Sequence, residues 1–305
     1  MTRSQTTLAA DAELTGVAFF TGGDVRVRFR PAPAGTGVLF VRTDLPGEPS
    51  VPATIEYALE LHRRTGVRRG EAEVQLTEHV LAALAGLRID NCRVEIDGPE
   101  LPGLDGSALG FAEALRSTGV RELDAPRKTL RVHRWVRAAD GDAEIVARPA
   151  EGHGPAAAGL RLEYHLDCGP ERPVPPQNFR CEITPERFLE EIAPARTFIT
   201  ADEIPALRAA GYGERVDAAD LLVFEPDGTV RGNAPRFPNE PARHKLLDMI
   251  GDLALLGCDL HAAVASRKGG HALNRDLCRT LRAAATRGDA PITEAIGVST
   301  DPAAA

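Results

Sequence analysis

Alternating and helix-spaced apolar residues divide the chain into two halves with a similar order of elements. Strict alternation of apolar and polar residues predicts strands at 24–32 and 36–44. The first half continues with a helix at 77–86, a strand at 91–98 and a helix at 107–119. In the second half, the pattern predicts strands at 128–138, 142–150 and 159–167, a helix at 242–256, a strand at 260–266 and a helix at 272–286.

This repeated order predicts an α+β fold of two similar domains, each with a sheet packed against helices. We expect an N-terminal domain at 1–126, a C-terminal domain at 127–290 and a disordered tail at 291–305. Residues 195–233 are expected to form an insertion in the second domain, with its own helix and short strands. The proline-rich stretch 170–177 predicts a loop.

Composition narrows the class of protein. The 305 residues are 43% hydrophobic and 26% charged, which is typical of a soluble globular protein. No apolar run approaches the ~18 residues that a membrane helix needs, and no secretory signal is visible. The five cysteines are scattered, which suits a reducing cytoplasm, and the net charge of −8 argues against nucleic-acid binding.

The helix predicted at 242–256 carries a histidine and two aspartates among its leucines. His244, Asp248 and Asp252 follow one another at four-residue steps, so they share one face of the helix. One interpretation is a solvated face with a surface ion pair. The other is that His244 and Asp248 bind a metal ion, which requires a third ligand from elsewhere in the chain.

The helix predicted at 77–86 begins with Glu78 and His79, with Thr77 as its expected N-cap. Glu78 and His79 could simply favour the helix start, or they could belong to a site. With His244 and Asp248, His79 completes a set of two histidines and one carboxylate, which suits zinc with one position left for water. Glu78 could then accept a proton from that water.

His271 follows two glycines at the junction of a predicted strand and helix. By itself it is typical of an exposed histidine near a helix start. If this loop faces the metal, His271 could act as a general acid, and Asp252 could orient its imidazole.

Five stretches, in this order and spacing, resemble one family: "TEHVLAALAGLRIDN", "GPELPGLDGSA", "ARTF", "RHKLLDMIGDL" and "GHALN". The family is that of the UDP-3-O-acyl-N-acetylglucosamine deacetylases, zinc amidases of bacterial lipid A synthesis. The resemblance extends from about residue 6 to 282. It implies hydrolysis of the 2-acetamido group of UDP-3-O-(3-hydroxyacyl)-N-acetylglucosamine to the free amine and acetate. It also implies two sheet-and-helix domains whose helix layers meet.

The resemblance implies roles for particular residues. The zinc ligands it implies are His79, His244 and Asp248, with Fe²⁺ compatible with the same set. The proton-transfer residues it implies are Glu78 as base, His271 as acid and Asp252 as the partner of His271.

The remaining implied roles concern the substrate. Thr197 would stabilise the oxyanion, Lys245 would reach substrate oxygens and Lys268 would contact a substrate phosphate. Phe198 and the insertion up to about residue 225 would form the passage for the acyl chain.

The chain also departs from the family pattern. Phe20 stands where the family has a histidine, and Gly103 stands where a bulkier apolar residue is common. The segment "GYGERVDAADLLVF" lacks the glycine-serine-asparagine pattern of the family's insertion, which predicts an acyl passage of different width or length.

The expected ligand is therefore a small amphiphilic molecule, with neither nucleic acid nor an obligate protein partner. The arginine-rich stretch 60–70 is interpreted as a solvated helix end or loop, or as a transient contact with an anionic membrane surface. Two rival functions stay open: a related zinc amidase that acts on a different acylated sugar nucleotide, and a non-catalytic paralogue that binds a lipid nucleotide.

Overall fold

The computed structural model describes residues 3–150 and 159–286. In its strands, buried and exposed residues alternate. In β3 (Asp24–Pro31), Val25, Val27 and Phe29 are buried, whereas the arginines between them face solvent. The expected α+β class is confirmed by the mixture of sheets and helices. The expected tail at 291–305 lies outside the described residues.

Two large sheets have the same strand order. The first sheet runs β2 (Ala12–Val17), β3, β8 (Cys92–Ile96), β4 (Val38–Arg42) and β5 (Ser50–Pro52). The second runs β11 (Val136–Asp140), β12 (Ala143–Arg148), β17 (Asp259–Arg267), β13 (Leu160–Leu166) and β14 (Gln177–Glu182). In both sheets the middle strand, β8 or β17, lies between an antiparallel strand (β3 or β12) and a parallel strand (β4 or β13). The short strand β10 (Thr129–Arg131) also pairs with β17, in parallel.

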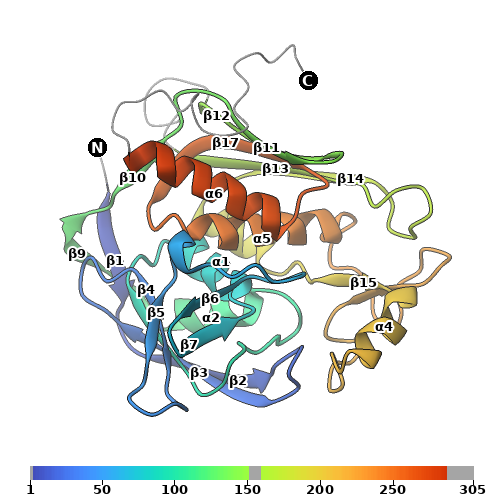
Figure 1. The fold of residues 1–305 in the computed structure, drawn as a ribbon, viewed down its shortest axis with the longest axis horizontal. Coiled ribbons are helices and arrows are strands. Elements are labelled where there is room, and N and C mark those ends of the chain that lie inside the picture. Colours follow the sequence, from blue (N-terminus) through green and yellow to red (C-terminus); the bar gives the residue numbers. More distant parts are fainter. Residues whose placement is uncertain (1–2, 151–158, 287–305) are drawn as a thin grey trace.

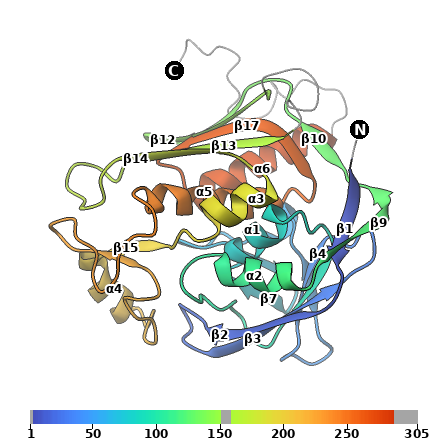
Figure 2. The ribbon, with the colours of Figure 1, turned by 180° about the vertical axis from the view of Figure 1, so that it is seen from behind.

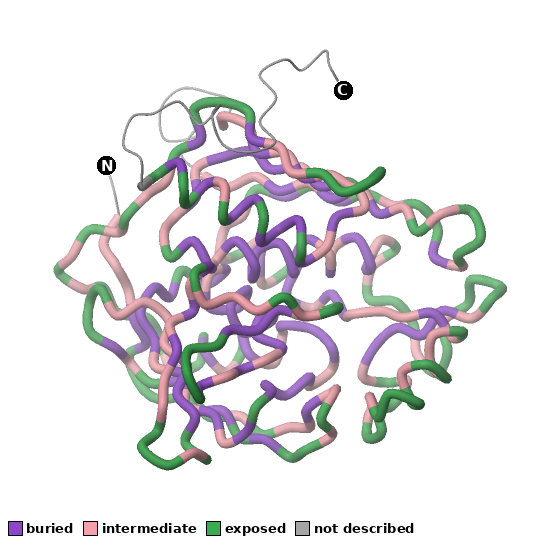
Figure 3. Tube along the Cα trace, in the orientation of Figure 1, coloured by how far each residue is buried: buried purple, intermediate pink, exposed green. Residues whose placement is uncertain are grey.

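The main helices lie between these sheets, as Figures 1 and 2 show from opposite sides. They are α1 (Glu78–Gly86), α2 (Leu109–Ser117), α5 (Glu240–Ala254) and α6 (His271–Thr286). Buried residues are concentrated along these helices in the middle of the molecule (Figure 3). Helix α5 is therefore buried on its charged side too, and its predicted span of 242–256 is confirmed to within two residues.

Helices α1 and α5 pack with almost no space between their backbones. A Cβ atom added to Gly251 would lie 2.1 Å from the carbonyl oxygen of Glu78. Ala82 and Ala83 are fully buried on α1. These small residues bring the first turn of α1 against α5, and this contact sets the distance between the polar residues of the two helices.

Replacing Gly251 by alanine is expected to lower the free energy of unfolding by about 1–3 kcal/mol, because the added methyl group must push one helix backbone away from the other. Urea denaturation would measure the change. Gly23→Ala is the matched control, because a Cβ atom there meets nothing within 4 Å. Equal stability of Gly251→Ala and the control would contradict this packing.

Some strands differ from the sequence prediction. The single strand expected at 128–138 is wrong, because the chain forms β10 (Thr129–Arg131), which pairs with β17, then a break, then β11. Another strand, β9 (Val120–Pro126), ends at the boundary expected between the two halves and pairs with β1 (Ser4–Leu8). These strands and the hairpin of β6 (Gly66–Arg69) and β7 (Ala72–Gln75) were not predicted, because they are short or lack a clean alternation of burial.

The expected insertion has its own helix and two short strands. These are β15 (Phe198–Thr200), α4 (Ile204–Ala209) and β16 (Leu222–Phe224), and they project to one side of the molecule (Figure 1). Short helical turns complete the fold: η1 (Ile55–Tyr57), α3 (Pro185–Arg187), η3 (Phe188–Ile192) and η4 (Ala201–Glu203). No helix among the described residues is long and apolar enough to cross a membrane.

Candidate metal and catalytic site

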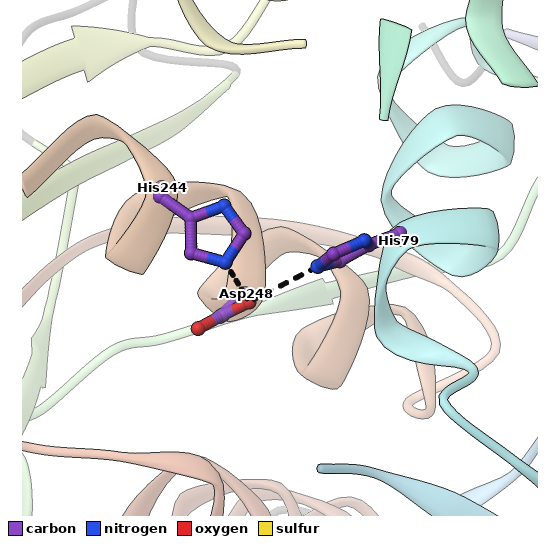
Figure 4. A group of neighbouring side chains, drawn as sticks. All are labelled: His79, His244 and Asp248. Carbon is purple, nitrogen blue, oxygen red and sulfur yellow. Dashed lines mark ion pairs between the residues drawn. The ribbon is translucent and has the colours of Figure 1, made fainter. Parts of the chain in front are cut away.

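The first turn of α1 and one face of α5 bring two histidines and an aspartate together (Figure 4). Asp248 Oδ1 lies 3.4 Å from His244 Nε2 and 3.9 Å from His79 Nε2. Each residue contributes a possible ligand atom, and these atoms lie within 4.8 Å of one another. All three residues are at most 4% exposed. The solvated-face interpretation of this helix is therefore wrong.

The chemistry of the three side chains fits a divalent metal ion. Burial and the neighbouring His244 lower the pKa of His79 to about 3, and burial also lowers the pKa of His244. Burial alone would raise the pKa of Asp248, but Lys245 and His244 hold it well below its usual range. Two neutral imidazoles and one carboxylate are the protonation states that metal binding requires.

The backbone orients one of these imidazoles. His244 Nδ1 lies 3.0 Å from the carbonyl oxygen of Ala195. A proton on Nδ1 donates to this oxygen and leaves Nε2, which faces Asp248, unprotonated and able to bind a metal ion. The buried Nδ1 of His79 has no hydrogen-bond partner among the described residues. Thr77 precedes α1 as expected, but its hydroxyl makes no capping hydrogen bond, so its predicted capping role is wrong.

A buried ion pair supports the segment that carries Ala195. Arg196 donates through its backbone N–H and Nε to Glu240 Oε1, at 2.9 Å each. Arg196 is 4% exposed and Glu240 is fully buried. Neither residue was a sequence candidate, because a salt bridge between residues 44 positions apart leaves no local signal.

Replacing Glu240 by glutamine is expected to lower the free energy of unfolding by about 3–5 kcal/mol, because the Arg196 guanidinium then stays buried without a counter-charge. The same replacement at Glu225, which pairs with Arg231 at the surface, should have little effect. Urea denaturation of both variants makes the comparison. Equal losses in the two variants would show that the buried pair stabilises the fold no more than the surface pair does.

Glu78 lies beside the cluster at the start of α1. Its side chain is almost fully buried, and burial raises its pKa to about 7. The backbone N–H of Thr65 donates to Glu78 Oε2 at 3.0 Å. A carboxylate held in place with a pKa near neutrality can accept and release a proton under ordinary conditions.

His271 approaches the cluster from the start of α6. Its Nε2 lies 3.8 Å from Asp248 Oδ2, and its Nδ1 lies 2.9 Å from Asp252 Oδ2. Burial alone would lower the pKa of His271, but Asp252 and Asp248 raise it to about 9. The imidazole is therefore protonated at neutral pH, which suits a general acid.

Two further residues of this network were not predicted from sequence. Asn274 Nδ2 donates to Asp252 Oδ2 at 2.8 Å, and the Thr65 hydroxyl donates to Asp252 Oδ1. Asn274 could have been found, since it lies one helical turn after His271. Thr65 could not, since it sits inside the arginine-rich stretch without any pattern of its own.

A cavity of about 840 Å³ begins at the cluster and continues between the two halves of the chain and the insertion. Its wall includes every other candidate that the sequence suggested: Thr197, Phe198, Lys245 and Lys268. The part built by the insertion is largely apolar, with Ile199, Ile204, Leu207, Val216 and Leu221 among its residues. A polar end and an apolar end suit an amphiphilic ligand.

The two lysines are already paired with carboxylates. Lys245 Nζ donates to Asp248 Oδ2 at 2.7 Å. Lys268 Nζ lies 2.7 Å from Asp142 Oδ2 and 3.3 Å from Asp167 Oδ2. Any phosphate at Lys268 would therefore have to compete with Asp142 and Asp167.

The arginine-rich stretch 60–70 forms no helix. It is a loop followed by strand β6, and several of its arginines contact other segments. Arg63 pairs with Glu203, and Arg64 stacks on aromatic rings. Arg69 donates to the carbonyl oxygen of Ser50. The interpretation of this stretch as a loop is therefore confirmed, and its interpretation as a helix end is wrong.

Two histidines and a carboxylate beside a buried glutamate and a third histidine form the arrangement of a metal-dependent hydrolase. Comparison with known proteins agrees with this class. Residues 5–283 match the family described as UDP-3-O-acyl N-acetylglycosamine deacetylase, LpxC, and the chain belongs to this family.

Individual relatives align with this chain over most of their length. The chain is 40% identical to a UDP-3-O-acyl-N-acetylglucosamine deacetylase of an Anaeromyxobacter species, covering 92% of this chain and 89% of the relative. It is 38% identical to the Myxococcus xanthus deacetylase of the same name, covering 91% and 86%. It is 36% identical to a bifunctional LpxC/FabZ enzyme of Chlorobaculum tepidum, covering 93% of this chain but 65% of that relative.

Proposed function

We propose that this chain is a zinc-dependent deacetylase that hydrolyses the 2-acetamido group of UDP-3-O-(3-hydroxyacyl)-N-acetylglucosamine. The observation that carries this proposal is the buried cluster of His79, His244 and Asp248, which faces Glu78 and His271 at the polar end of an apolar cavity. Family membership and the names of the relatives support the substrate. We place the reaction, a step of lipid A synthesis, in the cytoplasm, which suits five unpaired cysteines.

His79, His244 and Asp248 would hold the zinc ion. Bound there, zinc would act as a Lewis acid toward the amide carbonyl and would help to ionise a water molecule. Iron(II) fits the same ligand set.

The protein's own groups move the protons. Glu78 accepts a proton from the attacking water as the C–O bond forms, and it is held for this by the backbone of Thr65. His271 donates a proton to the nitrogen of the leaving amine as the C–N bond breaks. Asp252 orients the imidazole of His271 and stabilises its charge.

The other candidates bind the substrate. Thr197 would donate to the oxyanion, and Lys245 would reach substrate oxygens beside Asp248. Lys268 would contact a phosphate once Asp142 and Asp167 release it. Phe198 and the insertion would enclose the acyl chain.

We also propose that the two sheets belong to two similar domains, 1–126 and 127–290. Their shared strand order supports this division, since each half supplies one complete sheet. Both halves supply the site, because α1 and α5 come from different halves.

Acetate release from UDP-3-O-(3-hydroxyacyl)-N-acetylglucosamine tests the function. We expect release that stops on chelation and returns with zinc. Parallel assays with other acylated sugar nucleotides test the rival amidase. Binding of the substrate by folded, zinc-loaded protein without any acetate release would favour the non-catalytic paralogue.

A further inference from the structure

Three side chains form a stack where the insertion contacts the first half of the chain. Phe20 and Tyr212 both line the cavity, and their rings meet edge to face with centroids 5.1 Å apart. The guanidinium carbon of Arg64 lies 4.0 Å from the Phe20 centroid and 5.8 Å from the Tyr212 centroid. Arg64 does not line the cavity, so it supports the two rings from outside. We call Phe20, Tyr212 and Arg64 the cap.

The cap is fixed on both sides by hydrogen bonds. The backbone N–H groups of Phe20 and Thr21 donate to the carboxylate of Glu100 at 2.8 Å each, and Glu100 is fully buried. The backbone N–H of Gly213 donates to the carbonyl oxygen of Phe19 at 2.8 Å. The cap therefore joins the turn before β3 to the tip of the insertion.

A second set of contacts reinforces this junction. The Arg215 guanidinium donates to the carbonyl oxygen of Gly22 at 3.1 Å and to Asp24 Oδ1 at 2.8 Å. Arg64 Nε donates to Gln75 Oε1 at 2.9 Å. The cap is therefore also hydrogen-bonded to β7, and these contacts restrict the movement of its two rings.

Two departures from the family pattern lie in the cap, and the third lies beside it. Phe20 stands where the resemblance implies a histidine, and Tyr212 is the second residue of the divergent insertion segment. At Gly103, a Cβ atom would lie 2.0 Å from the ring of Phe19, so the ring occupies the space of the missing side chain. Gly103 thus makes room for Phe19, the residue before Phe20.

We propose that the cap sets the longest acyl chain that this enzyme accepts. The proposal rests on the proposed function, because it places the acyl chain in the cavity. Each methylene group buried in the cavity is expected to raise kcat/KM about fourfold, which corresponds to about 0.8 kcal/mol. A chain that reaches the cap must separate two rings that Arg64 holds together, so kcat/KM stops rising at that length.

The test is a profile of kcat/KM against acyl length for the wild type and two variants. Tyr212→Ala removes one ring of the wall, and Arg64→Met removes the cation but keeps an apolar stem. The peak should move to longer chains in both variants, and further in Tyr212→Ala. Arg69→Met is the matched control, because Arg69 lies 5.7 Å from the Tyr57 ring and neither residue lines the cavity. Its peak should stay at the wild-type length.

Calorimetric binding of the deacetylated amine products to the metal-free proteins separates this proposal from the proposed function. A length limit in binding that moves in the two variants, without any acetate release, would retain the cap and overturn the deacetylase. Acetate release with one peak length shared by all variants would overturn the cap and retain the deacetylase. Absence of binding and turnover at every length would overturn both.

Discussion

Replacing Glu78 by glutamine is expected to lower kcat about 10²–10⁴-fold, the range that loss of a general base costs. Glutamine has the shape of glutamate, and its carbonyl oxygen can still accept the N–H of Thr65. What it cannot do is take a proton from the attacking water. The loss should therefore fall on kcat, with little change in KM.

Metal content decides whether this loss is catalytic. Glu78 is outside the three-residue cluster, so Glu78→Gln should bind zinc as the wild type does. Glu73→Gln, on the neighbouring strand β7, is the control and should retain full activity. A fall in rate of less than tenfold, or loss of zinc from Glu78→Gln, would contradict the role of Glu78 as base.

Sequence patterns identified the buried helices and the central strands of both sheets. The helix at 242–256 carries its apolar residues at helical spacing, and β3 alternates strictly, so local periodicity was enough for both. The pairs β1–β9 and β6–β7 were not found. Their pairing depends on residues far apart or on short edges, where exposure removes the alternation that marks a strand.

The residues of the site also divide into those that the sequence pattern identified and those that it did not. His244, Asp248 and Asp252 share one helix face, and His79 has a matching position on another helix, so periodicity and donor chemistry brought them together. Thr65 and the Arg196–Glu240 pair act through tertiary contacts alone.

Removing a metal ligand is the second large effect expected. Loss of a residue that hydrogen-bonds to a metal ligand weakens metal binding about 10–100-fold. His79→Ala removes a ligand itself, so it should weaken zinc binding by more than that. Activity should fall with it, because the metal would no longer polarise the amide. His62→Ala is the matched control: His62 also lines the cavity but is not part of the cluster, so zinc content should stay at the wild-type level.

Thermal stability gives a readout of this loss that does not depend on turnover. A ligand that binds only the folded state stabilises it by about 2.7 kcal/mol when its free concentration is 100 times Kd. Zinc should therefore raise the Tm of the wild type and of His62→Ala over the chelated proteins. It should leave the Tm of His79→Ala almost unchanged. Because each variant is compared with itself, the packing lost with the imidazole cancels. An equal rise in Tm for His79→Ala would mean that zinc is held by other residues.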